Sequence, residues 1–398
     1  MRTLGVEEEL LLVRSGTGQA VSVAQQVLRR ADVIGDASPD GSGPAGTPGE
    51  AGSALEGELQ RQQVETGTAP HHHLVDLHEE LVSWRAHAES AARREGARVV
   101  ALGTSPFPVE AKAAPDERYR RIVDHFGRLG SEQLVCGCHV HVGVESDEEA
   151  IAVLDRVRVW LPTLLAVSAN SPYWEGEDSG YASYRAQVMG RWPSAGPPDL
   201  FGSHRGYRER VEAMVASGVV LDEGMVYLDA RPSRSYPTLE FRAADVCQDP
   251  RDAVVVAALC RALVETAAEQ WAAGKAAPPV PTQLLRLATW QASRFGLAGD
   301  LLDPYTSRPR PGAEVVGALV DHVRPALREA DDDLALVEEG MARLREVGTG
   351  ADRQRRELER TGSLGDVVAA AVRTTHGLDG EGHDFTVAGI GVGHGSGR

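Results

Sequence analysis

Stretches in which apolar and polar positions follow a strand-like pattern predict a sheet, because successive side chains of a strand point to opposite faces. Residues 134–144, LVCGCHVHVGV, show the alternation most clearly. There Cys138 and Val140 share one face, whereas His139 and His141 share the other. The expected strands cover residues 3–13, 58–67, 98–102, 134–144, 225–231 and 237–243.

Apolar residues spaced three or four positions apart predict helices through most of the remaining chain. Ser146 begins a capping-box sequence, and Pro162 is expected to kink or split the helix that follows it. Pro325 is expected to break a later helix in the same way. The expected helices cover residues 23–34, 74–95, 147–169, 250–273, 282–295, 313–346 and 351–374. The polar candidate residues lie on the expected strands, whereas helices make up most of the remaining chain. This arrangement favours an α+β fold with an antiparallel sheet.

The domain organisation follows from where Gly, Pro and Ser gather. We expect a single catalytic domain over residues 1–375, with its site motifs within 1–290 and a helical C-terminal part over 291–375. Residues 36–54 have the composition of a flexible surface loop. Residues 170–208 are expected to form a long functional loop. Residues 376–398, rich in Gly and His, are expected to be a disordered tail.

Composition and charge narrow the classes of partner. The 398 residues include 41 Lys plus Arg and 58 Asp plus Glu, a net charge of −17, so nucleic acid and anionic membranes are poor partners. The four cysteines are too few for a disulfide scaffold, and we expect a reduced, cytoplasmic protein without signal peptide or membrane span. Neither a phosphate-loop motif nor a dinucleotide-binding glycine motif occurs in the sequence.

Carboxylates gather on one face of two expected strands. In GVEEEL, residues 5–10, Glu7 and Glu9 project to the same face, whereas Glu8 points the other way, where it can have a structural partner. Two such carboxylates repel unless a proton or a cation lies between them. Glu65, in the stretch QVETGT, is a third candidate. The simpler alternative is an acidic strand that faces solvent.

Histidines and arginines occur on two further strands. His139 and His141 have a spacing common among metal ligands, although a polar face without a metal is equally compatible with the pattern. Glu240 and Arg242 share a face in TLEFR, and Arg231 follows the same pattern one strand earlier. A cross-strand salt bridge would also explain these two arginines. Taken together, the carboxylates favour Mg²⁺ or Mn²⁺, and the arginines suit phosphate groups, a combination that predicts phosphoryl transfer.

Six motifs in this order resemble the glutamate–cysteine ligase type 2 family, also called the YbdK-like carboxylate–amine ligases. The resemblance spans about residues 1–290 and is more distant to glutamine synthetase. The motifs are GVEEEL (5–10), QVETGT (63–68), GTSPF (103–107), CGCHVHVGV (136–144), SANSPYWEGEDSGYASYR (168–185) and DARPSRSYPTLEFR (229–242).

The resemblance implies a curved, mainly antiparallel sheet, a half barrel with helices packed on its convex side. It implies ATP and Mg²⁺, or Mn²⁺, as cofactors, small amino-acid substrates, and only by family analogy a homodimer. It places metal ligands at Glu7, Glu9, Glu65, His139 and Glu240. It places ATP or acyl-phosphate contacts at Arg231 and Arg242, and His141 beside the phosphates or a metal ligand. It places substrate contacts at Arg185, Tyr181 and Tyr184, within a 170–208 loop that closes as a lid.

The resemblance therefore implies an ATP-dependent ligase that joins the γ-carboxylate of glutamate to the amine of cysteine or of another molecule, through an acyl phosphate. Two alternatives stay open from the residues alone. One is a metal-dependent hydrolase or oxygenase that uses His139, His141 and a carboxylate. The other is a catalytically inactive relative that only binds ligands. Cys136 and Cys138 are expected to be buried fillers, since the neighbours of Cys138 on its face are valines.

Overall fold

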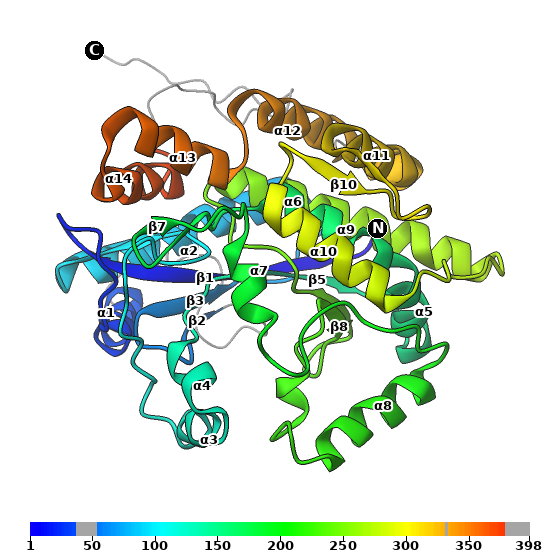
Figure 1. Ribbon diagram of the computed structural model, residues 1–398, viewed down its shortest axis with the longest axis horizontal. Helices are drawn as coiled ribbons and strands as arrows, with labels where there is room; N and C mark the ends of the chain where they lie inside the picture. Colours follow the sequence, from blue (N-terminus) through cyan, green and yellow to red (C-terminus); the bar gives the residue numbers. More distant parts are fainter. Residues whose placement is uncertain (37–53, 331–332, 379–398) are drawn as a thin grey trace.

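A seven-stranded antiparallel sheet lies at the centre of the molecule (Figure 1). The computed structural model describes residues 1–36, 54–330 and 333–378, so nearly all of the expected 36–54 loop and 376–398 tail lies outside the described residues. The strand order is β2-β3-β1-β5-β9-β8, and β4 also pairs with β1. The strands are β1 Leu4–Arg14, β2 Ala54–Gly57, β3 Gln63–Gly67, β4 Ala97–Val100, β5 Cys138–Gly143, β8 Ala230–Pro232 and β9 Thr238–Phe241.

Two of the expected strands differ from the observed ones. The segment predicted as one strand over 58–67 contains only β3, because residues 59–61 pair with the chain at 112–114 instead: the Arg61 amide donates to the Lys112 carbonyl at 2.8 Å. The strand predicted over 225–231 begins only at Ala230, after a 3₁₀ turn, η2 Glu223–Met225. The remaining strands appear within a few residues of their predicted positions.

The apolar face of the sheet packs against three helices, α2 Leu74–Arg94, α5 Asp147–Val157 and α9 Pro250–Ala272. Val6, Val140 and Leu239, from β1, β5 and β9, are each at most 1% exposed in this core. Helix α9 is buried along most of its length, and α11 Gly312–Glu329 and α12 Asp333–Val347 cover its far side (Figure 1). The layers confirm the expected arrangement of helices on one face of an antiparallel sheet.

Glu8, on the apolar face of β1, has the structural partner that the alternation predicted. Its two carboxylate oxygens accept hydrogen bonds from Arg85 of α2 at 2.6 and 2.8 Å. The same guanidinium donates to the carbonyls of Cys247 and Gln248 at 2.7 and 2.9 Å. The buried charge pair therefore ties β1, α2 and the segment before α9 together.

Local signals place several helix ends correctly. The Ser146 hydroxyl caps α5 by accepting from the Glu149 amide at 3.2 Å, while the Glu149 carboxylate binds the Glu145 amide. Pro162 lies in the first turn of a new helix, α6 Leu161–Ser168, after a short 3₁₀ turn, η1 Arg158–Trp160. The expected split of the 147–169 helix is therefore confirmed, because proline is tolerated in the first turn of a helix.

Two other expectations about helices and one about a loop were wrong in detail. The predicted 313–346 span does divide into two helices, α11 and α12, but α11 runs through Pro325 and ends only at Glu329, because Ala326 and Leu327 are buried and keep its last turn packed. The segment 351–374 forms two helices, α13 Gly350–Thr361 and α14 Leu364–Thr375, separated by Gly362 with a φ of +68°. Residues 170–208 are not one long loop. They contain β6 Tyr173–Trp174, β7 Glu177–Asp178, α7 Tyr184–Met189 and the start of α8 His204–Ala216.

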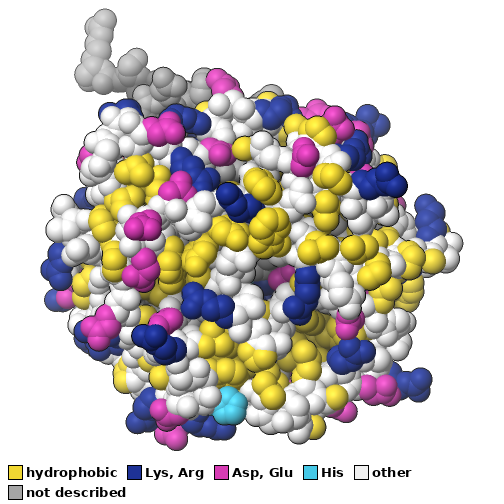
Figure 2. All heavy atoms as spheres, in the orientation of Figure 1, with side chains coloured by type: hydrophobic (Ala, Val, Ile, Leu, Met, Phe, Trp, Pro, Cys, Tyr) yellow, Lys and Arg dark blue, Asp and Glu magenta, His cyan; other side chains and the backbone are white. Residues whose placement is uncertain are grey.

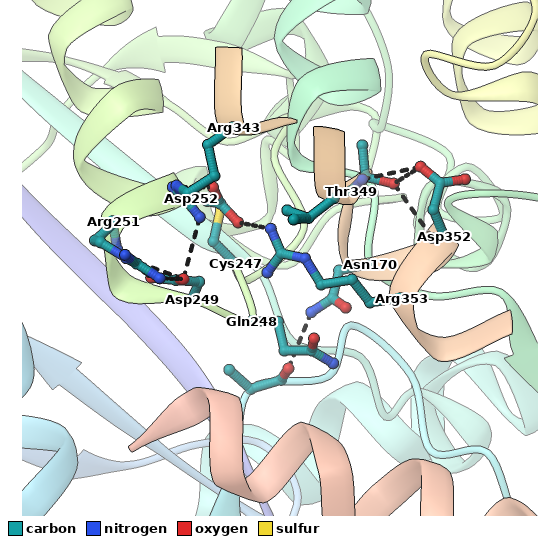
Figure 3. Close-up of polar contacts among 12 residues, drawn as sticks. Asn170, Cys247, Gln248, Asp249, Arg251, Asp252, Arg343, Thr349, Asp352 and Arg353 are labelled. Carbon is teal, nitrogen blue, oxygen red and sulfur yellow. Dashed lines mark hydrogen bonds and ion pairs between the residues drawn. The ribbon is translucent and has the colours of Figure 1, made fainter. Parts of the chain in front are cut away.

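A buried polar network fastens the C-terminal helices to α9 (Figure 3). Arg343 of α12 donates to Asp249 at 3.1 Å and to Asp252 at 2.5 Å. Arg353 of α13 donates to Asp252 at 2.8 Å, and Asp249 also caps the first turn of α9. The remaining elements are α1 Ala24–Asp36, α3 Glu117–Phe126, α4 Arg128–Glu132, α10 Thr282–Phe295, β10 Asp300–Leu302 and β11 Pro309–Pro311. Within the described ranges, no helix has the length and apolar character needed to cross a membrane.

Candidate active site

A polar cavity of about 340 Å³ lies on the face of the sheet opposite the main core. Its walls also include residues of α3, of α7 and of the segment before β8. Tyr181 and Tyr184 are not among the residues that line it. The cavity brings together nine residues that the sequence singled out, namely Glu7, Glu9, Glu65, His139, His141, Arg185, Arg231, Glu240 and Arg242.

Strand register explains why these side chains meet. In each antiparallel pair, residues directly opposite one another project to the same face and lie close together. Five neighbouring strands each contribute to one continuous polar surface in this way. The directly opposed pairs are Glu9 with Glu65, Glu7 with His139, His141 with Glu240, and Glu240 with Arg231.

Glu7 is at the centre of two groups of side chains that could hold a metal ion. One ligand atom from each of Glu7, Glu65 and His139 lies within 4.8 Å of the others, and the same is true of Glu7, His141 and Glu240. Oxygen-rich groups of this kind suit Mg²⁺ or Mn²⁺ better than zinc. Because Glu7 belongs to both groups, it would help to hold a cation in either one.

His141 has the hydrogen-bonding pattern of a metal ligand. Its Nδ1 atom lies 2.9 Å from the Thr238 hydroxyl, which fixes the ring. Its Nε2 atom is buried, has no hydrogen-bond partner among the described residues, and lies 3.4 Å from the Glu7 carboxylate. A buried nitrogen aimed at carboxylates, with its other ring atom anchored, is the arrangement in which imidazole binds a cation.

Charges in the cavity also fit a cation. Burial, followed by the carboxylates of Glu58, Glu7 and Glu9, raises the pKa of Glu65 well above its ordinary value. Burial, followed by the charge of Arg242, lowers the pKa of His139, which favours the neutral form of its imidazole. Crowded carboxylates beside a neutral imidazole are stabilised when a divalent ion replaces the shared proton.

Two arginines flank the carboxylate of Glu240. Arg231 donates from Nε at 2.9 Å, and Arg242 donates from Nη1. Burial alone would raise the pKa of Glu240, but the positive charges of Arg242 and Arg231 lower it to about 2. Arg231 also donates to the Val226 carbonyl at 2.8 Å, whereas Arg242 makes no further side-chain hydrogen bond among the described residues. The fork of Arg242 therefore has donors left for an anionic ligand in the cavity.

Arg185 is buried in the cavity wall, at only 4% exposure. It donates to the carbonyls of Ala243 and Arg242 at 3.3 and 3.4 Å, and lies 3.9 Å from Asp245. Its guanidinium packs against Gly137, where an added Cβ atom would lie 2.2 Å from Nη2. The absence of a side chain at position 137 therefore makes room for this arginine.

The two tyrosines that were grouped with Arg185 lie elsewhere. The Tyr181 hydroxyl accepts from the Trp290 indole at 3.3 Å, and the Tyr184 ring packs on Trp174. The start of the 170–208 segment is anchored rather than free, since the Ser171 hydroxyl donates to Asp245 at 2.7 Å. A substrate role for the tyrosines and a lid role for the segment stay predictions.

The sequence pattern missed several charged residues of the cavity, among them Glu58 and Arg118. Alternation in a continuous 58–67 strand would put Glu58 and Glu65 on opposite faces, but the turn before β3 brings their carboxyl groups into contact. Arg118 lies at the start of α3 and donates to Asp222 at 3.0 and 3.1 Å. Neither residue has a local signal, because tertiary structure alone places both in the cavity.

Known proteins resemble this chain along nearly its whole length. A candidate glutamate–cysteine ligase 2-1 of Streptomyces avermitilis is 50% identical over 377 residues, which is 95% of this chain and 100% of that protein. A candidate glutamate–cysteine ligase 2 of Streptomyces coelicolor is 50% identical over 375 residues, 94% of this chain and 99% of that protein.

Solved structures share the fold. The glutamate–cysteine ligase of Francisella tularensis in complex with AMP superposes with a TM-score of 0.64 at 11% identity, covering 95% of this chain and 89% of that one. A bifunctional glutathione synthetase of Pasteurella multocida gives a TM-score of 0.64 at 15% identity, covering 94% of this chain and 52% of that one. The model of glutamate–cysteine ligase family 2 matches residues 3–370, and the chain therefore belongs to this family.

Proposed function

We propose that this protein joins the γ-carboxylate of glutamate to the amine of cysteine, or of another small molecule, through an acyl phosphate made from ATP. The enzyme class, an ATP-dependent carboxylate–amine ligase, follows from membership of glutamate–cysteine ligase family 2. The observation that supports the proposal most is the surface of opposed Glu, His and Arg side chains across five strands. The relatives and structural neighbours give no support to a hydrolase or oxygenase.

The reaction has two steps. An oxygen of the acid's carboxylate forms a bond to the γ-phosphorus of ATP, the bond from that phosphorus to the β–γ bridging oxygen breaks, and ADP leaves. The amine nitrogen then forms a bond to the acyl carbon and gives up a proton, the acyl carbon–oxygen bond breaks, and phosphate leaves with that proton. In both steps negative charge gathers on phosphoryl oxygens, so positioning and positive charge supply most of the catalysis.

The residues of the cavity divide this work. Glu7, Glu9, Glu65, His139 and Glu240 would hold Mg²⁺ or Mn²⁺, and His141 lies close enough to join them. Bound divalent ions supply charge neutralisation on the phosphates. Arg242, with donors to spare, and Arg231 would hold the transferred phosphoryl group. Arg185 would bind a carboxylate of the substrate from its buried position in the wall.

The test is phosphate release from Mg²⁺–ATP by the purified protein, with products identified by mass spectrometry. Mixed amino acids are supplied first, followed by glutamate with and without cysteine. We expect phosphate and a new amide of glutamate. Phosphate release that does not depend on cysteine would keep the ligase class and remove cysteine as the amine. No phosphate release with any mixture would indicate an inactive relative and contradict the proposal.

Glu240→Gln tests the metal and arginine arrangement directly. It removes one charge while leaving the shape of the side chain, and loss of one charge-stabilising contact in an active site costs about 10²–10³ in turnover. Full activity in a folded Glu240→Gln variant would contradict its assignment. Glu314→Gln, on the exposed side of α11, is the matched control.

We also propose that residues 1–375 form a single catalytic domain. We further propose that the protein is a homodimer, and light scattering can test this by measuring the mass of the assembly.

A further inference from the structure

A second cavity, of about 230 Å³, lies directly beside the polar cavity. The two share four wall residues, Arg185, Met189, Tyr227 and Arg242. The second cavity lies between α6, α7, α10 and the segment before β8, and Figure 2 shows a hollow on this face, over the place where α7 and α10 lie in Figure 1. An acidic side chain is visible within the hollow, and Lys or Arg side chains lie beside it.

About half of the second cavity's wall is apolar, and one carboxylate in that wall has an oxygen without a partner among the described residues. Leu161, Leu165 and Trp290 supply apolar surface. The Oδ2 atom of Asp229 is buried and has no hydrogen-bond partner in the described part of the chain. The Oγ1 atom of Thr289, in the same wall, is also buried and unpartnered. A ligand in this cavity would therefore meet an unsatisfied acceptor and an unsatisfied hydroxyl in the same wall.

The Asp229 carboxylate has no structural task that its surroundings show. Its backbone does have one: the Asp229 amide donates to the Gly196 carbonyl at 2.9 Å, and its carbonyl accepts from the Arg242 amide at 2.8 Å. These bonds would be the same with any side chain. Burial raises the pKa of Asp229 to about 6, while the charges of Arg185 and Arg286 act in the opposite direction without forming an ion pair.

Buried carboxylates are nearly always paired, because an unpaired one destabilises the folded protein. Such a group in a cavity marks a candidate functional site, which a ligand would complete. A positively charged group of a ligand satisfies the carboxylate, while three arginines of the same wall, Arg185, Arg242 and Arg286, suit an anionic group of that ligand. The cavity is smaller than the roughly 300–1,000 Å³ of typical drug-sized sites, which favours a molecule of amino-acid size.

We propose that the second cavity binds the amine co-substrate of the ligation as an ammonium ion, with Asp229 as its counter-ion and Thr289 as a hydrogen-bond partner. This inference rests on the proposed function. The co-substrate class is an amino-acid-sized primary amine with an apolar side chain, which packs on Leu161 and Leu165. Arg286, at the exposed side of the same wall, provides a partner for a carboxylate when the amine is an amino acid.

The shared walls give such an amine a short path to the reaction. Arg242 contacts Glu240 on the metal side and also lines the second cavity, and Arg185 lines both cavities. An acyl phosphate held against these two arginines would have the metal groups on one side and the amine on the other. Once the ammonium ion has given one proton to the Asp229 carboxylate, the free nitrogen could approach the acyl carbon from the side away from the departing phosphate charge, and its second proton leaves with the phosphate.

Asp229→Asn tests this assignment, because it removes the charge and keeps the shape and both backbone hydrogen bonds. Apparent KM values are measured for the amine, the acid and ATP, using cysteine, valine, leucine and a simple alkyl amine as probes. We expect the KM for the amine to rise roughly 10- to 100-fold, the range for loss of a charged hydrogen bond, with the KM values for acid and ATP unchanged. Thr289→Val should raise the same KM by a smaller factor.

Hydroxylamine separates failure of this inference from failure of the proposed function. It is small and largely uncharged at neutral pH, so it can trap an acyl phosphate as a hydroxamate without needing a counter-ion. We expect wild type and Asp229→Asn to form hydroxamate at equal rates from ATP and the acid. Absence of both hydroxamate and amide in wild type would overturn the proposed function and this inference together. Hydroxamate in wild type with an unchanged amine KM in Asp229→Asn would overturn this inference alone.

Stability gives a readout that does not depend on activity. Because the Oδ2 atom of Asp229 is buried and has no hydrogen-bond partner among the described residues, Asp229→Asn should melt at the same temperature as wild type or higher. Asp321→Asn, which changes a carboxylate that is 72% exposed on α11, should alter neither the melting temperature nor any KM value. A lower melting temperature and equal loss of hydroxamate and amide in Asp229→Asn would show a structural role and refute the inference. Thr289→Val then remains as an independent test of the amine KM.

Discussion

Glu7 and Glu8 are neighbours on β1, and the same substitution should affect a different property at each position. Glu8 lies on the apolar face and accepts from Arg85 at 2.6 and 2.8 Å, with both side chains at most 1% exposed. Glu7 lies on the polar face, 3.3 Å from His139 and 3.4 Å from His141. Glu8→Gln should therefore lower stability, and Glu7→Gln should lower activity.

The size of the stability effect follows from burial. Glu8→Gln leaves the Arg85 charge in the core without a counter-charge, and breaking a buried ion pair costs about 3–5 kcal/mol. An unfolding entropy of about 2.1 cal/mol/K per residue gives about 0.8 kcal/mol/K for 398 residues, and thus a fall in Tm of roughly 4–6 °C. The carbonyls of Cys247 and Gln248 keep Arg85 hydrogen-bonded, so we expect the variant to fold.

The measurement is thermal unfolding, followed by circular dichroism, beside phosphate release below the transition. We expect Glu8→Gln to keep near wild-type turnover at low temperature. Glu7→Gln should lose about 10²–10³ in turnover with little change in Tm, because it removes charge from a crowded carboxylate cluster. If Glu8→Gln lost turnover without losing stability, or Glu7→Gln unfolded the chain, the division of β1 into a structural and a chemical face would be wrong.

Three further predictions concern packing, pH and thiol reactivity. Gly137→Ala should displace the Arg185 guanidinium, since the new Cβ would lie 2.2 Å from Nη2. This displacement should raise the KM for the acid and lower the free energy of unfolding, measured by denaturant titration, by about 1–3 kcal/mol. An unchanged KM would contradict the prediction. Burial alone would raise the pKa of Asp249, but Arg251 and Arg343 outweigh burial and lower this pKa from 3.8 to about 2. The difference in free energy of unfolding between wild type and Asp249→Asn should therefore be greatest above pH 5 and should disappear as the pH falls through about 2. A difference that does not depend on pH would contradict this. The four buried cysteines, whose pKa values burial raises, should react with a thiol reagent only after denaturation.

The sequence by itself determined which side chains share a face. Period-two alternation in β1 and β5 assigned Glu7, His139 and His141 to the polar side and Glu8 to the core. Capping residues and prolines likewise located the ends of α5, α6 and α9, because these signals act through hydrogen bonds within a few residues. Local chemistry was enough for these features.

Tertiary structure alone decided which strands are neighbours and where loops return. Glu58 meets Glu65 only because the chain turns before β3, and Arg118 reaches the cavity only through the packing of α3. The burial of Ala326 and Leu327 kept α11 intact beyond Pro325, against the local preference. Asp229 became notable only when the fold buried its carboxylate without a partner. These outcomes depend on contacts between residues distant in the chain, and local spacing carries no information about such contacts, because strand order and helix packing are set by the burial of the whole apolar surface.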